Sequence, residues 1–153
     1  MMPIVVELCT EPDIDRVFHI ISDSFGHTQP FIDTLFPRHD TPEGYVLGRD
    51  RLLEQMRTDS GVRFTKALDS ETGQIIGQAN WLILEEKRTD VQPEDDPWGD
   101  AEDKEHAQQL FAQYMVPRSK AFHSANGKIV GRSCTLATHE KIRLTVSPRT
   151  AIC

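Results

Sequence analysis

Six histidines and three cysteines are the side chains of this sequence with the widest choice of chemistry. The histidines are His19, His27, His39, His106, His123 and His139. The zinc motif HExxH is absent, so we expect no metal site, although ligands assembled from distant positions remain an alternative. Cys9 and Cys134 lie in apolar stretches typical of buried, unreactive thiols, and the nucleophile motif GxSxG is missing. Nucleophilic and metal-dependent hydrolysis are therefore not predicted.

Phosphate-binding chemistry also lacks its usual motifs. Neither GxGxxG nor GxxxxGK[ST] occurs, and no stripe of Lys and Arg offers a surface for nucleic acid. The 153 residues are 38% hydrophobic and 27% charged, with a net charge of −7. No segment approaches the roughly 18 consecutive apolar residues that a bilayer-spanning helix needs. The first residues also lack the basic segment followed by an apolar segment that is typical of a secretion signal. We expect one cytoplasmic domain, residues 1–153, with reduced cysteines and no membrane or nucleic-acid partner.

The acidic charge is concentrated in one segment. Glu85 to Glu105 holds ten acidic residues against three basic ones, and it contains Pro93 and Pro97. This pattern predicts a solvated acidic loop, residues 85–100, joining two structured regions. An alternative is a flap that attracts cationic molecules towards a neighbouring site.

Asn80 and Trp81 are candidates for contact with a small organic ligand. They lie in the middle of an apolar stretch, where an aromatic ring beside an amide group can line an acceptor site. The alternative for Trp81 is a tryptophan of the hydrophobic core. Gln78 and Asn80 share the strand face predicted for Ile76, and Ile75 shares the face of Trp81.

Hydrophobic periodicity predicts the elements that hold these residues. Ile14, Val17, Phe18, Ile21 and Phe25 form one face of a helix that begins near Glu11 and ends at Gly26. The other expected elements are strands at 4–8, 62–68, 74–84 and 128–138, and helices at 31–36, from Thr41-Pro42 to Gly61, and from Asp100 to a kink or end at Pro117. This order predicts an α/β (α+β) fold with a mixed, mainly antiparallel central sheet flanked by helices.

The sequence resembles the first half of GNAT-type acyl-CoA-dependent N-acetyltransferases, and fungal members are especially similar. The resemblance covers residues 3 to about 140. It rests on the opening strand, the helix start Thr10-Glu-Pro-Asp-Ile14, the phrase Gly73-Gln-Ile-Ile-Gly-Gln-Ala-Asn-Trp81, the acidic Asp96-Pro-Trp-Gly99 before a helix, and Gly127-Lys-Ile-Val-Gly131. Leu136 to His139 would then end the central strand.

This resemblance implies a reaction and a set of site residues. The family transfers an acetyl group from acetyl-CoA to an amine of a small molecule or peptide. By position, the backbone of Leu136, Ala137 and Thr138 would contact the coenzyme, and His139 would be the catalytic base. Asn80 and Trp81 would form the acceptor wall.

The sequence departs from the family after the central strand. Family members continue into a glycine-containing loop whose backbone N–H groups hold the coenzyme pyrophosphate, whereas residues 132–153 contain no glycine. We therefore expect a chain truncated before that loop, with an atypical tail at 140–153 that is either native or a frame or splicing artefact. The alternative function is a catalytically inactive fragment that acts as a binding or interaction module. The alternating residues 141–147 predict a further strand, and the exposed sheet edge predicts a possible homodimer.

Overall fold

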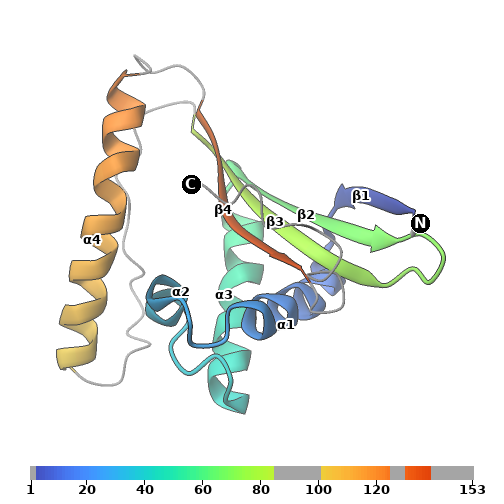
Figure 1. The fold of residues 1–153 in the computed structure, drawn as a ribbon, viewed down its shortest axis with the longest axis horizontal. Coiled ribbons are helices and arrows are strands. Elements are labelled where there is room, and N and C mark those ends of the chain that lie inside the picture. Colours follow the sequence, from blue (N-terminus) through green and yellow to red (C-terminus); the bar gives the residue numbers. More distant parts are fainter. Residues whose placement is uncertain (1–2, 85–100, 125–129, 139–153) are drawn as a thin grey trace.

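The four strands found among the described residues form one antiparallel sheet. The computed structural model describes residues 3–84, 101–124 and 130–138. The strands are β1 (Ile4–Leu8), β2 (Val62–Asp69), β3 (Ile75–Leu84) and β4 (Val130–Thr138), and they lie side by side in the order β1-β2-β3-β4 (Figure 1). Each neighbouring pair is antiparallel. The predicted fold class is confirmed, and β4 is the outermost described strand on its side; the strand expected in the tail lies outside the described residues.

Helix α1 (Ile14–Phe25) follows a short 3-10 turn, η1 (Glu11–Asp13). Thr10 begins this segment, and its backbone N–H and its hydroxyl both donate to Asp13 Oδ2, at 2.7 and 2.8 Å. The first of these bonds satisfies a backbone N–H that a helix start leaves unpaired. The helix ends at Gly26, whose φ of 49° suits a residue without a Cβ. Both predicted ends of this helical segment are therefore confirmed.

Two further helices precede β2. They are α2 (Pro30–Leu35) and α3 (Pro42–Thr58). At the start of α3, Thr41 Oγ1 accepts a hydrogen bond from the Gly44 N–H at 3.1 Å, as the predicted cap requires. The helix ends before the expected Gly61, because Asp59 turns the chain: its Oδ1 accepts from the Gly61 N–H at 2.9 Å.

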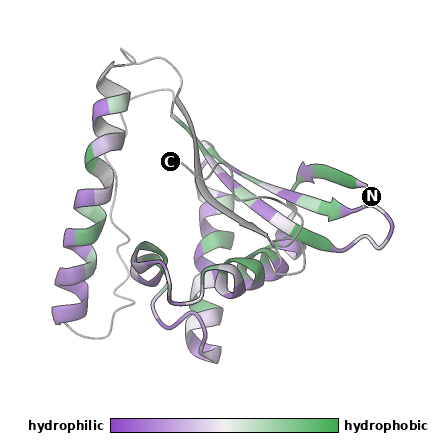
Figure 2. Ribbon diagram, in the orientation of Figure 1, coloured by the Kyte–Doolittle hydropathy of each residue, from purple (hydrophilic) through white to green (hydrophobic). Residues whose placement is uncertain are grey.

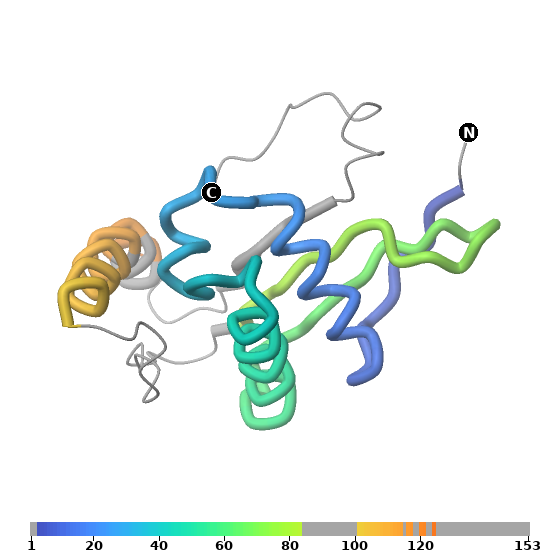
Figure 3. The backbone as a smooth tube through the Cα atoms, turned by 90° about the horizontal axis from the view of Figure 1, so that it is seen from below, coloured from blue at the N-terminus to red at the C-terminus, as the bar shows by residue number. Residues whose placement is uncertain are grey.

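The hydrophobic core lies between one face of the sheet and helices α1 and α3. Helix α1 packs on β3 and β4, and α3 packs on α1 and β2 (Figures 1 and 3). The core side chains come from the predicted face of α1, from α3 and from β2 and β3; they include Ile14, Val17, Phe18, Ile21, Leu52, Val62, Phe64 and Ile75. Their burial removes apolar surface from water, which is the main favourable term in folding.

A bulge changes the face on which one predicted residue lies. Ala67 pairs with Gly77 and Leu68 pairs with Ile75, so Ile76 has no partner on β2. The extra residue reverses the alternation of side chains along β3. Ile75 therefore joins the core under the helices, and its predicted place on the face of Trp81 was wrong.

Helix α4 (Ala101–Ser124) lies beside α2, to one side of the sheet (Figures 1 and 3). The Phe31 ring of α2 stacks on Tyr114, with centroids 3.9 Å apart, and on Phe111 at 6.3 Å. The helix continues through Pro117 to Ser124, so of the two alternatives predicted at this proline, a kink or an end, the end was wrong. Residues 85–100 of the acidic segment lie outside the described residues, whereas residues 101–105 form the first turns of α4. Acidic side chains are favourable at this helix end.

Strand β1 is an apolar strand at the other edge of the sheet (Figure 2). The side chains of Ile4, Val6 and Leu8 are all exposed. None of the described helices is both long and apolar enough to cross a bilayer.

Candidate functional site

The pairing of β3 with β4 brings most of the predicted site residues together. Leu136 lies opposite Ala79, Ala137 opposite Gln78, and Thr138 opposite Gly77. The backbone that the sequence assigns to the coenzyme therefore runs next to the strand that the sequence assigns to the acceptor. His139, the predicted base, lies outside the described residues.

Strand β4 is irregular beside the predicted acceptor residues. Asn80 pairs with Thr135 and Trp81 with Ser133, so Cys134 has no partner on β3. Such a bulge interrupts the regular hydrogen bonding of the ladder and redirects the backbone groups of the extra residue. Bulges are frequent next to active sites for this reason, and this one lies midway along the strand.

Asn80 and Trp81 lie on opposite faces of the sheet. Asn80 pairs with the core residue Phe64, and paired residues share a face, so Asn80 points towards the layer of helices. Trp81 points to the other face, where its indole N–H donates to Thr65 Oγ1 at 3.2 Å. Trp81 is 41% exposed, so the alternative of a core tryptophan is excluded. The two side chains do not form one continuous wall, and their contact with an acceptor stays a prediction.

Gln78 joins Asn80 as a buried amide on the helix side of the sheet. The two side chains are only 3% and 6% exposed. Within the described part of the chain, Gln78 Nε2 and Oε1 and Asn80 Oδ1 have no hydrogen-bond partner. An unpaired buried polar group costs roughly 1–3 kcal/mol, so a native protein that keeps such groups usually uses them. The sequence predicted that Gln78 and Asn80 share one face of the strand, but it did not identify Gln78 as a site residue. Two amide side chains two positions apart in an otherwise apolar strand were the signal that could have identified it.

An ion pair neutralises the charge next to these amides. Lys66 lies opposite Gln78 on β2, and its Nζ donates to Asp13 Oδ2 at 2.7 Å. Burial opposes the charged form of Asp13, but hydrogen bonds from Lys66 and Thr10 outweigh it and lower the carboxyl pKa. The same hydrogen bond raises the pKa of Lys66. Both side chains are therefore charged at neutral pH and paired with each other.

The one cysteine whose side chain is described is unsuited to nucleophilic chemistry. Cys9 is buried, and burial together with the negative charge of Asp13 raises its pKa to about 11. The thiolate is the reactive form of cysteine, and very little of it exists at pH 7. The burial predicted for Cys9 is confirmed, whereas the side chain of Cys134 lies outside the described structure.

The structure also gathers histidines that the sequence analysis kept apart. His19 forms an exposed pair with Asp23, at 3.2 Å across one helical turn. His27, Asp33 and His39 place one potential metal-ligand atom each within 4.8 Å of one another. His27 lies after α1, Asp33 on α2 and His39 in the turn before α3, so no single helix or strand joins them, which is why no sequence motif marked them.

Comparison with known proteins identifies the fold. No family model matches the sequence, and no curated protein matches it. Among solved structures, one similar chain is described as histone acetyltransferase HPA2 and related acetyltransferase from Corynebacterium glutamicum ATCC 13032. It is 16% identical, with a TM-score of 0.51, and the match covers 93% of this chain and 64% of that one.

A second similar structure is the aminoglycoside antibiotic 6'-N-acetyltransferase AAC(6')-Ih from Acinetobacter baumannii. It is 10% identical with a TM-score of 0.43, and the match covers 94% of this chain and 62% of that one. The chain thus spans less than two thirds of the length of either structure. The first likeness shows that the chain has the fold of GNAT acetyltransferases, as the sequence predicted.

Proposed function

We propose that this chain is an acyltransferase of the GNAT type, which transfers an acetyl group from acetyl-CoA to an amine of a small molecule or peptide. One observation supports it above the others: in this fold, the bulge of β4 lies beside the buried, unpaired amide atoms of Gln78 and Asn80. An irregular backbone next to unsatisfied polar groups is what a ligand-binding strand pair requires.

The proposed reaction is a direct attack. The neutral amine nitrogen forms a bond to the thioester carbonyl carbon, the carbon–sulfur bond breaks, and the coenzyme leaves as a thiolate. The amine proton passes to a base or water and finally protonates the thiolate. A backbone N–H released by the bulge at Cys134 would polarise the thioester carbonyl oxygen. His139 remains our proposal for the base.

The described residues can bind the acyl-pantetheine end of the coenzyme. Its amides can pair with the backbone along β4, as an added strand would, and Leu136 to Thr138 are the residues proposed for that contact. The buried amides of Gln78 and Asn80 would hold polar groups of the thioester end and of the acceptor that meets it. Because Asn80 and Trp81 lie on opposite faces, we assign the acceptor to the Asn80 face.

The sequence is less suited to binding the diphosphate end of the coenzyme. A backbone cradle for diphosphate needs glycine, where a Cβ would block the close approach of phosphate, and residues 132–153 have none. We therefore propose that binding energy comes mainly from the acyl-pantetheine part. The negative charge of residues 85–105 favours a cationic amine as the acceptor.

Isothermal titration of the chain with acetyl-CoA and with S-acetylpantetheine tests this proposal. We expect both to bind, with dissociation constants within about tenfold of each other, because the diphosphate adds little. Coenzyme A without the acetyl group is the matched control for the thioester contact. An absence of heat with both thioesters at millimolar concentration would rule out the acyltransferase.

The lack of a glycine loop favours a second candidate, a catalytically inactive binding module. It predicts binding of a partner or small ligand without release of free thiol from acetyl-CoA. A thiol-release assay with a panel of peptide and polyamine acceptors separates the two candidates.

A homodimer through the sheet edge is a further proposal, and a strictly monomeric mass in sedimentation at micromolar concentration would contradict it.

A further inference from the structure

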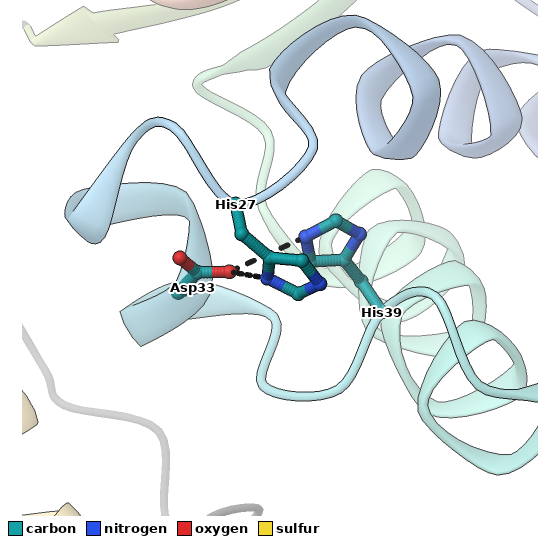
Figure 4. A group of neighbouring side chains, drawn as sticks. All are labelled: His27, Asp33 and His39. Atoms are coloured by element: carbon teal, nitrogen blue, oxygen red, sulfur yellow. Dashed lines mark hydrogen bonds and ion pairs between the residues drawn. The ribbon is translucent and has the colours of Figure 1, made fainter.

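Two histidines and an aspartate converge on one point between helices α1, α2 and α3 (Figure 4). His27 directly follows the glycine that ends α1, Asp33 lies on α2, and His39 lies in the turn before α3. His27 Nδ1 is 2.8 Å from Asp33 Oδ1, and His39 Nε2 is 3.4 Å from the same oxygen. Three donor atoms from three separate segments therefore face a common centre.

These distances are close to the spacing of ligands around a small divalent ion, and the ligand atoms of His27 and His39 lie within 4.8 Å of each other. Zinc binds histidine nitrogen and carboxylate oxygen at about 2.0–2.2 Å, so tetrahedral ligands lie roughly 3.3–3.5 Å apart. The separation between His39 and Asp33 already falls in this range, and the shorter contact of His27 needs only a small movement of its ring. His27 is 57% exposed, which leaves that ring free to move.

Each histidine also has a partner for its other ring nitrogen. His27 Nε2 is 3.1 Å from Asp40 Oδ2, so this N–H donates to a carboxylate while Nδ1 faces the centre. Metal-binding histidines commonly have such a carboxylate behind them, because it fixes the tautomer and makes the ligand nitrogen more basic.

His39 is held in the same way by a serine. It is 1% exposed, its Nε2 donates to the Gly26 carbonyl oxygen at 3.0 Å, and its Nδ1 lies 2.7 Å from Ser22 Oγ. When Nε2 binds a metal, the ring proton moves to Nδ1 and is donated to Ser22 Oγ. The serine hydroxyl then donates to the His39 carbonyl oxygen, 3.3 Å away. Both tautomers of the ring are therefore supported without rearrangement.

We propose that His27, Asp33 and His39 form a binding site for a divalent transition metal ion of the zinc class. Imidazole and carboxylate ligands suit zinc, and three protein ligands leave a fourth position for water or the Gly26 carbonyl. The ion would tie the end of α1 to α2 and to the start of α3. This site is independent of the proposed acyltransferase chemistry.

Zinc titration of the chelator-treated full chain tests the site, with Co²⁺ absorption as a second readout. We expect one equivalent of Zn²⁺ to bind and Co²⁺ to show the intense visible bands of tetrahedral coordination. His27→Gln and Asp33→Asn should each weaken binding by at least tenfold. Asp40→Ala, which removes only the hydrogen-bond support behind His27, should weaken it by about 10–100-fold.

His19→Gln is the matched control, because it removes an exposed histidine that also pairs with a carboxylate but lies outside the cluster. Binding should remain unchanged in this variant. Absence of stoichiometric binding would overturn the site, and so would binding that survives either His27→Gln or Asp33→Asn. Both of these residues are partly exposed, so their substitution leaves the hydrophobic core intact.

Discussion

Gln78 and Asn80 keep polar atoms in a place where apolar side chains would fit. Between them, three buried amide atoms lack a hydrogen-bond partner among the described residues. Burial without a partner lowers stability, so these side chains are a stability cost that a ligand contact can explain.

Replacing Gln78 with Met should separate stability from binding. The two side chains have similar shapes, and the change removes both unpaired atoms. We expect the free energy of unfolding to stay constant or rise by up to about 2 kcal/mol, while the binding of S-acetylpantetheine weakens at least tenfold. Urea unfolding and calorimetric titration measure the two effects.

Gln74→Met is the control for this experiment, because Gln74 is an exposed glutamine just before the same strand. It should change neither quantity appreciably. A marked loss of stability in Gln78→Met would show that the amide has partners in the folded protein, contrary to our assignment.

The ion pair of Asp13 and Lys66 makes part of the stability depend on pH. The pKa of Asp13 is lowered in the folded protein, although burial opposes this, because Lys66 and Thr10 hydrogen-bond to the carboxylate. A carboxyl whose folded pKa is below its unfolded value of about 3.9 stabilises the fold above that pH and loses this contribution as the pH falls through the folded pKa.

Asp13→Asn should therefore lower the free energy of unfolding by roughly 2–3 kcal/mol at pH 7, as expected for a charged hydrogen bond. The difference from the unaltered protein should shrink below pH 4. Urea denaturation at pH 7, 5 and 3 measures it. A difference that stays constant over this range would refute the role of the carboxylate charge.

At the scale of elements, α1 and α3 approach closely because Gly48 has no side chain. The Phe18 ring occupies the space that a Cβ at this position would take. The same ring meets Phe36 and Tyr45 edge to face, each with centroids 5.2 Å apart, so it has little freedom to move aside.

Gly48→Ala should consequently destabilise the protein by a net amount of about 1–2 kcal/mol. Overpacking typically costs about 1–3 kcal/mol, and here it should exceed the roughly 1 kcal/mol that alanine adds to helix propensity. Thermal and urea unfolding measure the loss. Leu47→Ala, at an exposed neighbouring position of α3, should change stability by less than about 0.5 kcal/mol. Equal stability of the alanine variant at 48 and the unaltered protein would contradict this packing.

The elements themselves were largely predictable, because local signals specify them. The 3.6-residue period of α1, its Thr10 start and the Thr41 cap of α3 are all present as expected. The exact positions of the two strand bulges were not predicted, although Gly77, next to the extra residue of β3, is of a type that often marks a bulge within a strand. Their positions depend on how neighbouring strands align, and no local propensity at Ile76 or Cys134 encodes that alignment.

The site was predictable only in part for the same reason. The sequence indicated β3 and the end of β4, and the structure brings these segments side by side. It placed Asn80 and Trp81 on opposite faces of the strand, but it could not show that the helices cover the face of Asn80. Nor could it join His27, Asp33 and His39, whose proximity arises from the turns around α2.

At the scale of the whole molecule, the described helices and strands form a sheet with one face covered by helices. Helices α1 and α3 cover one face of the sheet, β4 lies at the side of the described strands, and α4 extends the molecule along α2 (Figure 1). The negative charge of the chain is concentrated in the segment between β3 and the first turns of α4. Our central claim is that a thioester binds along β3 and β4 in this setting.

Amide chemical-shift mapping with S-acetylpantetheine tests that claim most directly. We predict that the perturbed backbone amides cluster at Gly77 to Trp81 and at Thr135 to Thr138, with little change in β1 or α4. Perturbations confined to other elements, or none at millimolar ligand, would contradict the claim.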